Sequence, residues 1–467
     1  MDNHKALCAA IIAIASIIAI SLVVCAPSSD ADSQDTGKCG DDVSWTFYPD
    51  QSKLVIEGQG AIYDYSASEE RWGGNLDSKE NSVAVEIGEG VTRVGSYAFS
   101  GCKSITSIKF PDSLAEIGTY SFSACDKIAS IHIPKGVVNI GDNAFYSCTN
   151  LASIEVTEEN LAFQSHEGVL YTKGLTELIL CPYNKDGTYD LPDGVKVIKS
   201  ESLNSSKLKG ITLPDTLETI ESSAFWFCNS IVSLEIPKNV ESIGIQMTYD
   251  CPNLQAINVD PENKYYASDN GVLFDKKMSR ILIYPQARSG TYYDVSESVK
   301  QIDDYAFSYC DNLTEVTLPK GLSTLGQFAF FKCSSLSKVT INYGPSTIRQ
   351  NTFQGCSSLS EIIIPDSVKE IENWSFTSCE NISSIFIPYS VSKLGYNAFD
   401  VSFYIAGEKL NNTADNLRGH HFEKKDGKLE AVEPGVQTIS FEAIGGNDVA
   451  PLTTSRYGRL SELPNTQ

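Results

Sequence analysis

The sequence predicts a repeat solenoid, a fold in which short stacked coils share one elongated hydrophobic core. The first observation is a 23-residue period in the cysteines, which stand at positions 102, 125 and 148, at 228 and 251, and at 310, 333, 356 and 379. The second is that whole segments of that length, such as 91–113 and 114–136, align without gaps. A fixed period in the twenties is typical of solenoids, because one such unit cannot bury its own apolar face.

The N-terminal segment, residues 1–26, is predicted to direct the chain out of the cytoplasm. Residues 6–26 carry no charge and are rich in Ile, Ala, Leu and Val. As a helix, about 21 such residues would be roughly 30 Å long, which is enough to cross a bilayer. Three interpretations stay open: a cleaved signal peptide, an uncleaved membrane anchor, or a lipid-modified Cys25. A polar linker is expected over 27–38.

Each repeat contains two short apolar patterns. The first is V-x-x-I-G-x-x-A-F, represented by Val91, Val94, Ala98 and Phe99. The second is C-x-x-L-x-x-I-x-I-P, whose alternating end predicts a short strand with one buried face. The proline that follows in most copies has no backbone donor, so it ends the strand and turns the chain.

Two longer segments interrupt the repeats, near 157–194 and 259–298. They correspond at an offset of 103 residues, so that Cys148 matches Cys251 and Gly168 matches Gly271. Each is predicted to form a two-stranded hairpin followed by a turn, because Gly, Asn and Asp supply the turn conformations. The array is therefore expected to have grown by duplication of a block as well as of single repeats.

On these features the chain resembles the BspA-type leucine-rich repeat family over roughly 39–425. The period, the cysteine column, the Ala-Phe pair and the Ile-Pro strand end all recur. The resemblance implies an N-terminal β cap over 39–82 and a leucine-rich-repeat solenoid over 83–425, with a curved parallel sheet on its concave side and turns or short helices elsewhere. Family members are typically surface or secreted proteins, several of them implicated in adhesion. Ser205 and Ser402 depart from the pattern, since they stand where the repeat cysteine is expected.

The C-terminal tail, residues 426–467, changes in character. Residues 437–467 resemble the first half of an internalin-type B-repeat, a small β-grasp module, through Gly445-Gly446 followed by Val-Ala-Pro, Tyr-Gly and Leu-Pro. The second half of that module is not matched. An extended tail without a folded module is the alternative.

The nine cysteines of the column are expected to be buried free thiols. Stacked strands place equivalent Cα atoms about 4.8 Å apart, which is within the range of a disulfide. However, their Cβ vectors run parallel, which suits stacking, and a buried thiol behaves as a small hydrophobic group. Cys39 lies outside the column and is interpreted as either a reactive thiol or a partner for a column cysteine of the cap.

Composition and motifs argue against several classes of function. Acidic residues outnumber basic ones by 59 to 36, which gives a net charge of -23, and so negative a surface repels nucleic acid. Adjacent His420 and His421 cannot share the i, i+4 face of a helical zinc site, and no G-x-S-x-G, Walker or H-E-x-x-H motif occurs. A 23-residue ladder of cysteines also lacks the convergent spacing of a metal site. We therefore expect no enzyme activity, metal or cofactor.

The predicted binding surface lies on the concave side of the solenoid. In each short strand the residues flanking the middle apolar position should point outward, and the second of these positions varies most. Near the C-terminal end this column turns apolar, as expected of a contact patch unless residues 400–425 fold over it. The candidate residues of this column are Lys109, His132, Glu155, Glu235, Ile363 and Phe386.

A second candidate surface is an aromatic ladder on the flank. Most of its members stand two residues before the repeat phenylalanine, where they are predicted either to hold a peptide or glycan or to pack against one another. The candidates are Tyr97, Tyr120, Trp226, Tyr305, Phe328 and Trp374.

The sequence thus favours a secreted or surface-attached module for protein binding or adhesion, with an extracellular protein or glycan as ligand. Contact with a membrane is expected only through residues 1–26. Two alternatives stay open. The first is a structural surface or matrix component that self-associates, and the second is an enzyme with a site built on the insertions.

Overall fold

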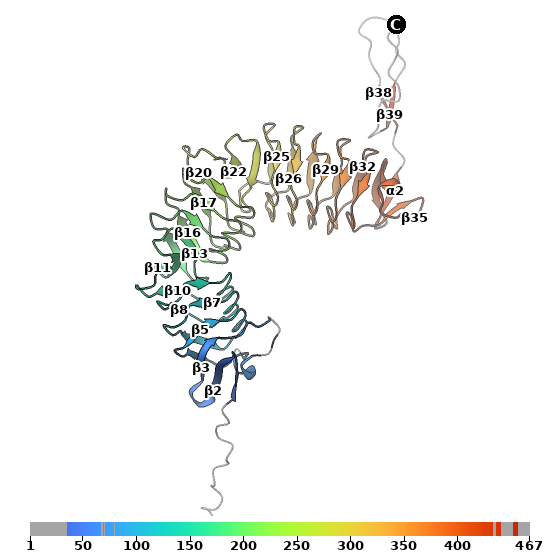
Figure 1. Cartoon of the computed structure of the whole chain (residues 1–467). Coiled ribbons are helices and arrows are strands. Elements are labelled where there is room, and N and C mark those ends of the chain that lie inside the picture. Colours follow the sequence, from blue (N-terminus) through green and yellow to red (C-terminus); the bar gives the residue numbers. More distant parts are fainter. Residues whose placement is uncertain are drawn as a thin grey trace, which may run out of the picture. The chain divides into compact units, whose positions relative to one another are not determined.

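The computed structural model of the chain describes residues 35–66, 69, 71–78, 80–432, 436–439 and 452–455. Within them the chain is a β-solenoid of stacked coils with few helices (Figure 1), as the sequence predicts. It divides into two compact units, one formed by residues up to 128 with 139–146 and the other by 129–138 with 147–467. The apolar residues 1–26 lie outside the described part, within which no helix is long and apolar enough to cross a membrane.

The first unit begins with an antiparallel cap that continues into the solenoid. Strand β1 pairs with β2 and β2 with β3, and β3 then runs parallel to β4 and β5 of the first coil. Residues 35–38, which the sequence assigns to a linker, belong to this cap, because Asp35 pairs with Phe47 and Lys38 with Ser44. The elements of the cap are β1 (Asp35–Lys38), β2 (Asp42–Tyr48), η1 (Pro49–Gln51), β3 (Lys53–Ala61) and η2 (Trp72–Gly74).

Each repeat contributes two strands, and the equivalent strands of successive repeats form two sets, the first and second columns, whose parallel pairing is interrupted at several places. The first column holds ten alternating strands predicted from the sequence: β6 (Ile105–Lys109), β8 (Ser130–Ile133), β10 (Ser153–Val156), β16 (Lys207–Thr212), β18 (Ser233–Ile236), β20 (Ala256–Val259), β26 (Glu315–Leu318), β28 (Lys338–Ile341), β30 (Glu361–Ile363) and β32 (Ser384–Ile387). Three further strands of this column were not predicted: β4 (Val83–Ile87), β14 (Asp186–Asp190) and β24 (Tyr292–Asp294).

The second column holds the strands that begin each repeat, nearly all two residues long. These strands are β5 (Val91–Val94), β7 (Glu116–Ile117), β9 (Asn139–Ile140), β15 (Val197–Ile198), β17 (Thr219–Ile220), β19 (Ser242–Ile243), β25 (Gln301–Ile302), β27 (Thr324–Leu325), β29 (Thr347–Ile348), β31 (Glu370–Ile371) and β33 (Lys393–Leu394).

The repeat phenylalanines form a buried spine in each unit. In the first unit Phe99 stacks on Phe122 with ring centroids 5.0 Å apart, and Trp72 of the cap stacks on Phe99 at 4.6 Å. The repeat glycine allows this close stacking of coils. A Cβ added to Gly118 would lie 2.6 Å from the backbone nitrogen of Ser96, so any larger residue would push neighbouring coils apart.

Each insertion forms three antiparallel strands, one more than the sequence predicts. The third strand also pairs in parallel with the second column, through Glu177 with Val197 and Arg280 with Gln301, and so joins the insertion to the next coil. The strands are β11 (Phe163–His166), β12 (Val169–Thr172) and β13 (Glu177–Leu180) in the first insertion, and β21 (Tyr266–Asp269), β22 (Val272–Asp275) and β23 (Arg280–Ile283) in the second.

The C-terminal end of the solenoid is closed by an antiparallel hairpin. Strand β36 pairs with β32, and β37 pairs with β36, so the repeat sheet extends past residue 425 to Val432. Phe403 and Phe422 continue the spine beyond Phe399 with ring centroids 5.6 and 4.7 Å apart. The closing elements are β34 (Phe403–Ile405), β35 (Glu408–Lys409), α2 (Ala414–Leu417), β36 (His420–Lys425) and β37 (Lys428–Val432).

Two strands of the tail are described, β38 (Val436–Ile439) and β39 (Leu452–Ser455), which pair with each other in antiparallel fashion. Residues 445 and 446 and the Tyr-Gly and Leu-Pro features of the B-repeat resemblance lie outside the described residues. The resemblance to a β-grasp module therefore stays a prediction.

Candidate binding surfaces

Strands β26, β28, β30 and β32 are consecutive in a nine-stranded sheet of the second unit, and we call their outward side the strand face. These strands pair in parallel, so residues 23 positions apart stand directly beside one another. Val316, Val339, Ile362 and Ile385 point into the core, and the alternation turns the residues on either side of them outward. The strand face consists of Glu315, Thr317, Lys338, Thr340, Glu361, Ile363, Ser384 and Phe386.

An apolar pair interrupts this otherwise polar face at its C-terminal end. Ile363 and Phe386 are cross-strand partners, and Thr340 is the partner of Ile363 on its other side. Ile363 is 46% exposed and Phe386 is half-buried. Two large apolar side chains that stand side by side on an otherwise polar sheet form a candidate contact patch.

The C-terminal segment extends the strand face and does not cover Ile363. His421 of β36 is the cross-strand partner of Phe386, and its Nε2 lies 2.8 Å from the Ser384 hydroxyl. Strand β36 therefore continues the sheet beside Phe386. This role of His421 was not predicted from the sequence, because antiparallel pairing with a repeat strand leaves no 23-residue signal.

The other candidates of this column lie outward and engage polar neighbours. Lys109 in the first unit is 2.8 Å from Glu86, whose carboxylate also contacts Lys53 at 2.5 Å. The hydrogen bond from Lys109 lowers the pKa of Glu86 most and the one from Lys53 adds to the effect, so that this pKa falls to about 2. The lysine side chain is 76% exposed, so its ammonium stays accessible at this edge.

In the second unit, His132 and Glu155 are cross-strand partners on β8 and β10. The His132 Nε2 lies 2.9 Å from the Thr157 hydroxyl. Further along, Glu235 accepts a hydrogen bond of 2.8 Å from the Asn258 amide. These pairs tie adjacent coils together, and they leave His132, Glu155 and Glu235 exposed.

The aromatic flank residues pack against one another. Tyr97 stacks on Tyr120 with centroids 5.2 Å apart, and Tyr305 stacks on Phe328 at 4.7 Å. Trp374 meets the exposed Tyr396 edge-on at 6.1 Å. The stacked rings cover the coil edges. Of the two roles predicted for these residues, this arrangement corresponds to packing against one another.

Trp226 takes a different position in the coil, one residue after the spine phenylalanine. It stacks on Phe227 at 5.2 Å and meets Tyr249 edge-on at 5.8 Å. Its indole Nε1 is buried and has no hydrogen-bond partner among the described residues. Tyr249 also lines a cavity at the second insertion, which was not predicted from the sequence. The feature of the sequence that corresponds to this cavity is Thr248, which stands where most repeats have phenylalanine.

Among the described residues, the column cysteines and Cys39 are buried and form no disulfide with one another. Burial raises the pKa of the Cys39 thiol to about 12, which disfavours the reactive thiolate. The prediction that Ser205 stands at the cysteine position is wrong by one residue. Ser206 is buried there, with its hydroxyl 3.7 Å from the Cys228 sulfur. No cluster of three or more His, Cys, Asp or Glu suited to a metal ion is found in the described part of the chain.

Family comparison agrees with this architecture. Residues 77–186, 183–277 and 284–423 match the model of the BspA type leucine rich repeat region, in six copies. The chain belongs to the BspA-type leucine-rich repeat family. No curated protein matches it.

Among solved structures, a leucine rich cell surface protein from Faecalibacterium prausnitzii is 22% identical, covers 78% of this chain and 91% of its own, and has a TM-score of 0.52. A leucine-rich repeat protein from Eubacterium ventriosum is 19% identical, with coverages of 79% and 95% and a TM-score of 0.40. The pneumococcal vaccine antigen PcpA is 20% identical, with coverages of 79% and 86% and a TM-score of 0.46. The first of these likenesses supports the repeat fold.

Proposed function

We propose that this BspA-type repeat protein is a non-catalytic adhesion module, exposed outside the cytoplasm, that binds an extracellular protein through the strand face. The observation that carries the proposal is the apolar pair Ile363 and Phe386, set in register on a polar sheet. Binding energy at protein interfaces is concentrated in a few large side chains surrounded by polar residues. The 46% exposure of Ile363 leaves such an anchor uncovered.

The charges around the pair supply a polar rim. Lys338 lies 3.6 Å from Glu315 on one side and is the cross-strand partner of Glu361 on the other. Exposed ion pairs of this kind contribute little to folding, but they orient a partner whose charges are complementary. With a net charge of -23, the chain favours a partner whose contact surface is basic. The cell-surface description of the Faecalibacterium protein is consistent with an exported location.

Self-assembly as a matrix component has weaker support. Addition of a second chain to the repeat sheet requires a free strand edge, and β36 and β37 occupy the edge of β32. The sheet then ends at β35, whose two residues, Glu408 and Lys409, are charged and exposed. Such an edge disfavours further pairing of strands.

Binding can be tested by surface plasmon resonance with the purified full chain over immobilised fibronectin, fibrinogen, laminin and collagen. We expect saturable binding to at least one of them, and an Ile363→Glu variant should lose at least tenfold in affinity. Val232→Glu is the matched control, because Val232 is 44% exposed and lies away from the strand face. Equal affinity of Ile363→Glu and the parent chain would remove the strand face from the proposal. Ligand-free assembly of the parent chain in light scattering would favour the matrix alternative.

A further inference from the structure

The phenylalanine spine of the second unit has a gap at Thr248. In the coils after the second insertion the spine rings stack without interruption, with Phe307 on Phe330 at 4.8 Å and Phe330 on Phe353 at 5.3 Å. Tyr284, from the end of the insertion, stacks on Phe307 at 4.8 Å. Thr248 takes the spine position in the coil before the insertion, and its small side chain leaves the space beside Tyr284 unfilled.

A cavity occupies this gap. It measures about 320 Å³ including its open mouth. Its enclosed part has room for about one water molecule or one hydroxyl group, and not for a whole ring. A ligand would therefore place one polar group inside and keep the rest of its body at the mouth. The larger polar and aromatic side chains of the lining are Gln246, Tyr249, Tyr284, Gln286, Asp304 and Tyr305.

Gln286 provides an acceptor for such a group. Its side chain is 8% exposed, and its amide Oε1 is buried with no hydrogen-bond partner among the described residues. A buried carbonyl oxygen without a donor costs about 1–3 kcal/mol, and protein interiors rarely leave one in that state. The atom therefore requires an O–H or N–H donor from water or from a ligand.

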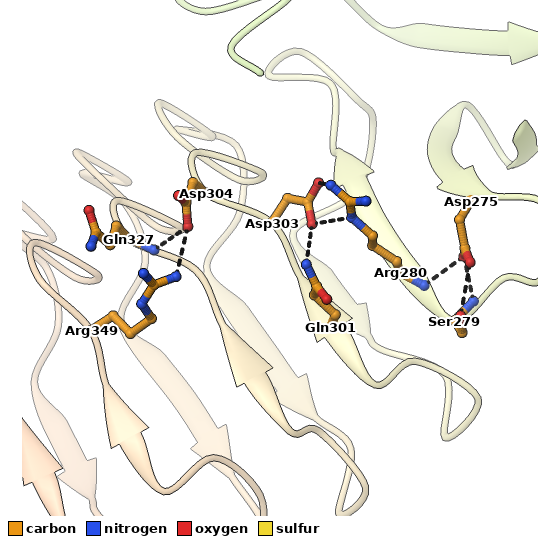
Figure 2. Close-up of polar contacts among 8 residues, drawn as sticks. All are labelled: Asp275, Ser279, Arg280, Gln301, Asp303, Asp304, Gln327 and Arg349. Atoms are coloured by element: carbon orange, nitrogen blue, oxygen red, sulfur yellow. Dashed lines mark hydrogen bonds and ion pairs between the residues drawn. The ribbon is translucent and has the colours of Figure 1, made fainter. Parts of the chain in front are cut away.

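Asp304 adds a second acceptor that is held in place. Its Oδ1 accepts the backbone N–H of Gln327 at 2.8 Å and the Arg349 guanidinium at 3.3 Å (Figure 2). Neither contact uses Oδ2. The carboxylate is therefore fixed by two donors on the neighbouring coils, and it retains acceptor capacity on the second oxygen.

Tyrosine rings complete the lining. Tyr249 meets Tyr305 edge-on with centroids 5.6 Å apart, and the hydroxyls of Tyr249 and Tyr309 are 3.1 Å apart. The lining itself contains no Lys, Arg or His, and the guanidinium groups beside it are engaged, Arg288 by the Tyr284 hydroxyl and Arg349 by Asp304. The Asp304 carboxylate in the lining disfavours a phosphate, sulfate or carboxylate ligand. Aromatic rings with fixed carboxylate and amide acceptors suit a neutral ligand that has both apolar C–H faces and hydroxyl donors.

We propose that this cavity is a subsite for a neutral pyranose, which places one hydroxyl on the Gln286 amide oxygen and rests its C–H face against the tyrosine rings. The subsite is separate from the strand face and goes beyond the proposed protein-binding function. A result for or against sugar binding at the cavity therefore does not decide whether the strand face binds a protein.

The first block of the chain provides an internal comparison. At the offset of 103 residues, Phe145 stands where the second block has Thr248, and Tyr183 stands where it has Gln286. Both aromatic residues are buried, with exposures of 1% and 6%. Large side chains are thus accommodated at both positions in the related block. Thr248→Phe should therefore fill the cavity without unfolding the coil, and the smaller leucine of Gln286→Leu should also be tolerated.

The test is saturation-transfer difference NMR on the purified full chain, kept in a polyoxyethylene detergent because sugar-based detergents would compete. The probes are the methyl glycosides of glucose, galactose, mannose and N-acetylglucosamine, with methyl sialoside as the anionic comparison. We expect transfer to at least one neutral glycoside and none to the sialoside. Gln286→Leu, which removes the acceptor, and Thr248→Phe, which fills the cavity, should each weaken binding at least tenfold.

The control is Tyr265→Ala, because this exposed tyrosine belongs to the same insertion but does not line the cavity. It should bind as the parent chain does, and circular dichroism should show all variants folded. The proposal fails if no neutral glycoside binds the parent chain, in which case the cavity holds only water. It also fails if Gln286→Leu and Thr248→Phe, both folded, bind as well as the control, or if the sialoside binds best.

Discussion

Arg280 of the second insertion and Asp303 of the following coil form a two-point ion pair. The guanidinium Nε lies 2.5 Å from Oδ1 and Nη2 lies 2.6 Å from Oδ2, while Gln301 donates a third hydrogen bond to the carboxylate (Figure 2). The Asp303 side chain is 10% exposed. In the first block Glu177 and Lys199 stand at the corresponding positions with the charges reversed, and Lys199 is 2.8 Å from Glu221 of the next coil.

Asp303→Ala is therefore expected to loosen the junction between the second insertion and the solenoid. The donors on Arg280 and Gln301 would lose their acceptor, which should lower the free energy of unfolding by about 1–3 kcal/mol. The Arg280 side chain is 45% exposed and can regain water, which keeps the cost below that of a fully buried pair. Hydrogen exchange should show faster amide exchange over 280–283 and 301–303, with 361–364 unchanged. Uniform protection in the variant would contradict this role.

Asn263 and its counterpart Asn160 are expected to be essential to the insertions. The Asn263 amide donates to the carbonyls of Pro237 and Val240 at 2.8 and 3.0 Å, and its oxygen accepts two backbone N–H groups at 2.8 Å. The side chain is 1% exposed, so Asn263→Ala leaves buried backbone groups unpaired and should cost about 2–4 kcal/mol. Asn258→Ala, on an exposed strand position, is the control. Thermal unfolding measures both, and equal melting temperatures would disprove the role assigned to Asn263.

Structural features that repeat every 23 residues can be predicted from the sequence, whereas features that depend on one particular contact cannot. The 23-residue period requires the strand columns, because Val316, Ile362 and Ile385 must all face one core. Asn160 and Asn263 share their offset of 103, yet nothing in one sequence separates a buried amide from an exposed turn asparagine. The pairing of His421 with Phe386 joins a repeat strand to a segment outside the repeat. The cavity lies where Thr248 replaces the repeat phenylalanine; the repeat pattern shows this substitution, but it does not show whether neighbouring side chains fill the space.

Burial of the column thiols predicts a loss of stability at alkaline pH. Burial raises the pKa of Cys102 from 9.0 to about 12, so between these values the unfolded chain loses a proton that the folded chain retains. The free energy of unfolding contributed by this thiol is therefore constant below about pH 9. It should fall by about 1.4 kcal/mol per pH unit up to about pH 12.

The measurement is thermal unfolding of the parent chain and Cys102→Ala across this pH range. The variant is less stable at neutral pH because it leaves a small cavity. The difference between the two should shrink as the pH rises from 9 to 12, since only the parent chain has this thiol to ionise on unfolding. Val94→Ala is the matched control, because Val94 is fully buried and does not titrate. A constant difference for Cys102→Ala, as for Val94→Ala, would show that the thiol does not contribute.

The C-terminal hairpin is expected to keep the solenoid monomeric at its last coil. Strand β36 covers the edge of β32, where Ile387 and Ser384 pair with His420 and Glu423, and Phe422 packs on Phe403. Truncation after residue 419 would expose the backbone donors and acceptors of β32, an arrangement that templates pairing with another chain. Size-exclusion chromatography with light scattering should then show dimers or larger species at micromolar concentration. Truncation after residue 432 retains the hairpin and should run as the parent chain does. A monomeric product from the shorter truncation, still folded by circular dichroism, would mean that the edge of β32 is protected by something other than β36.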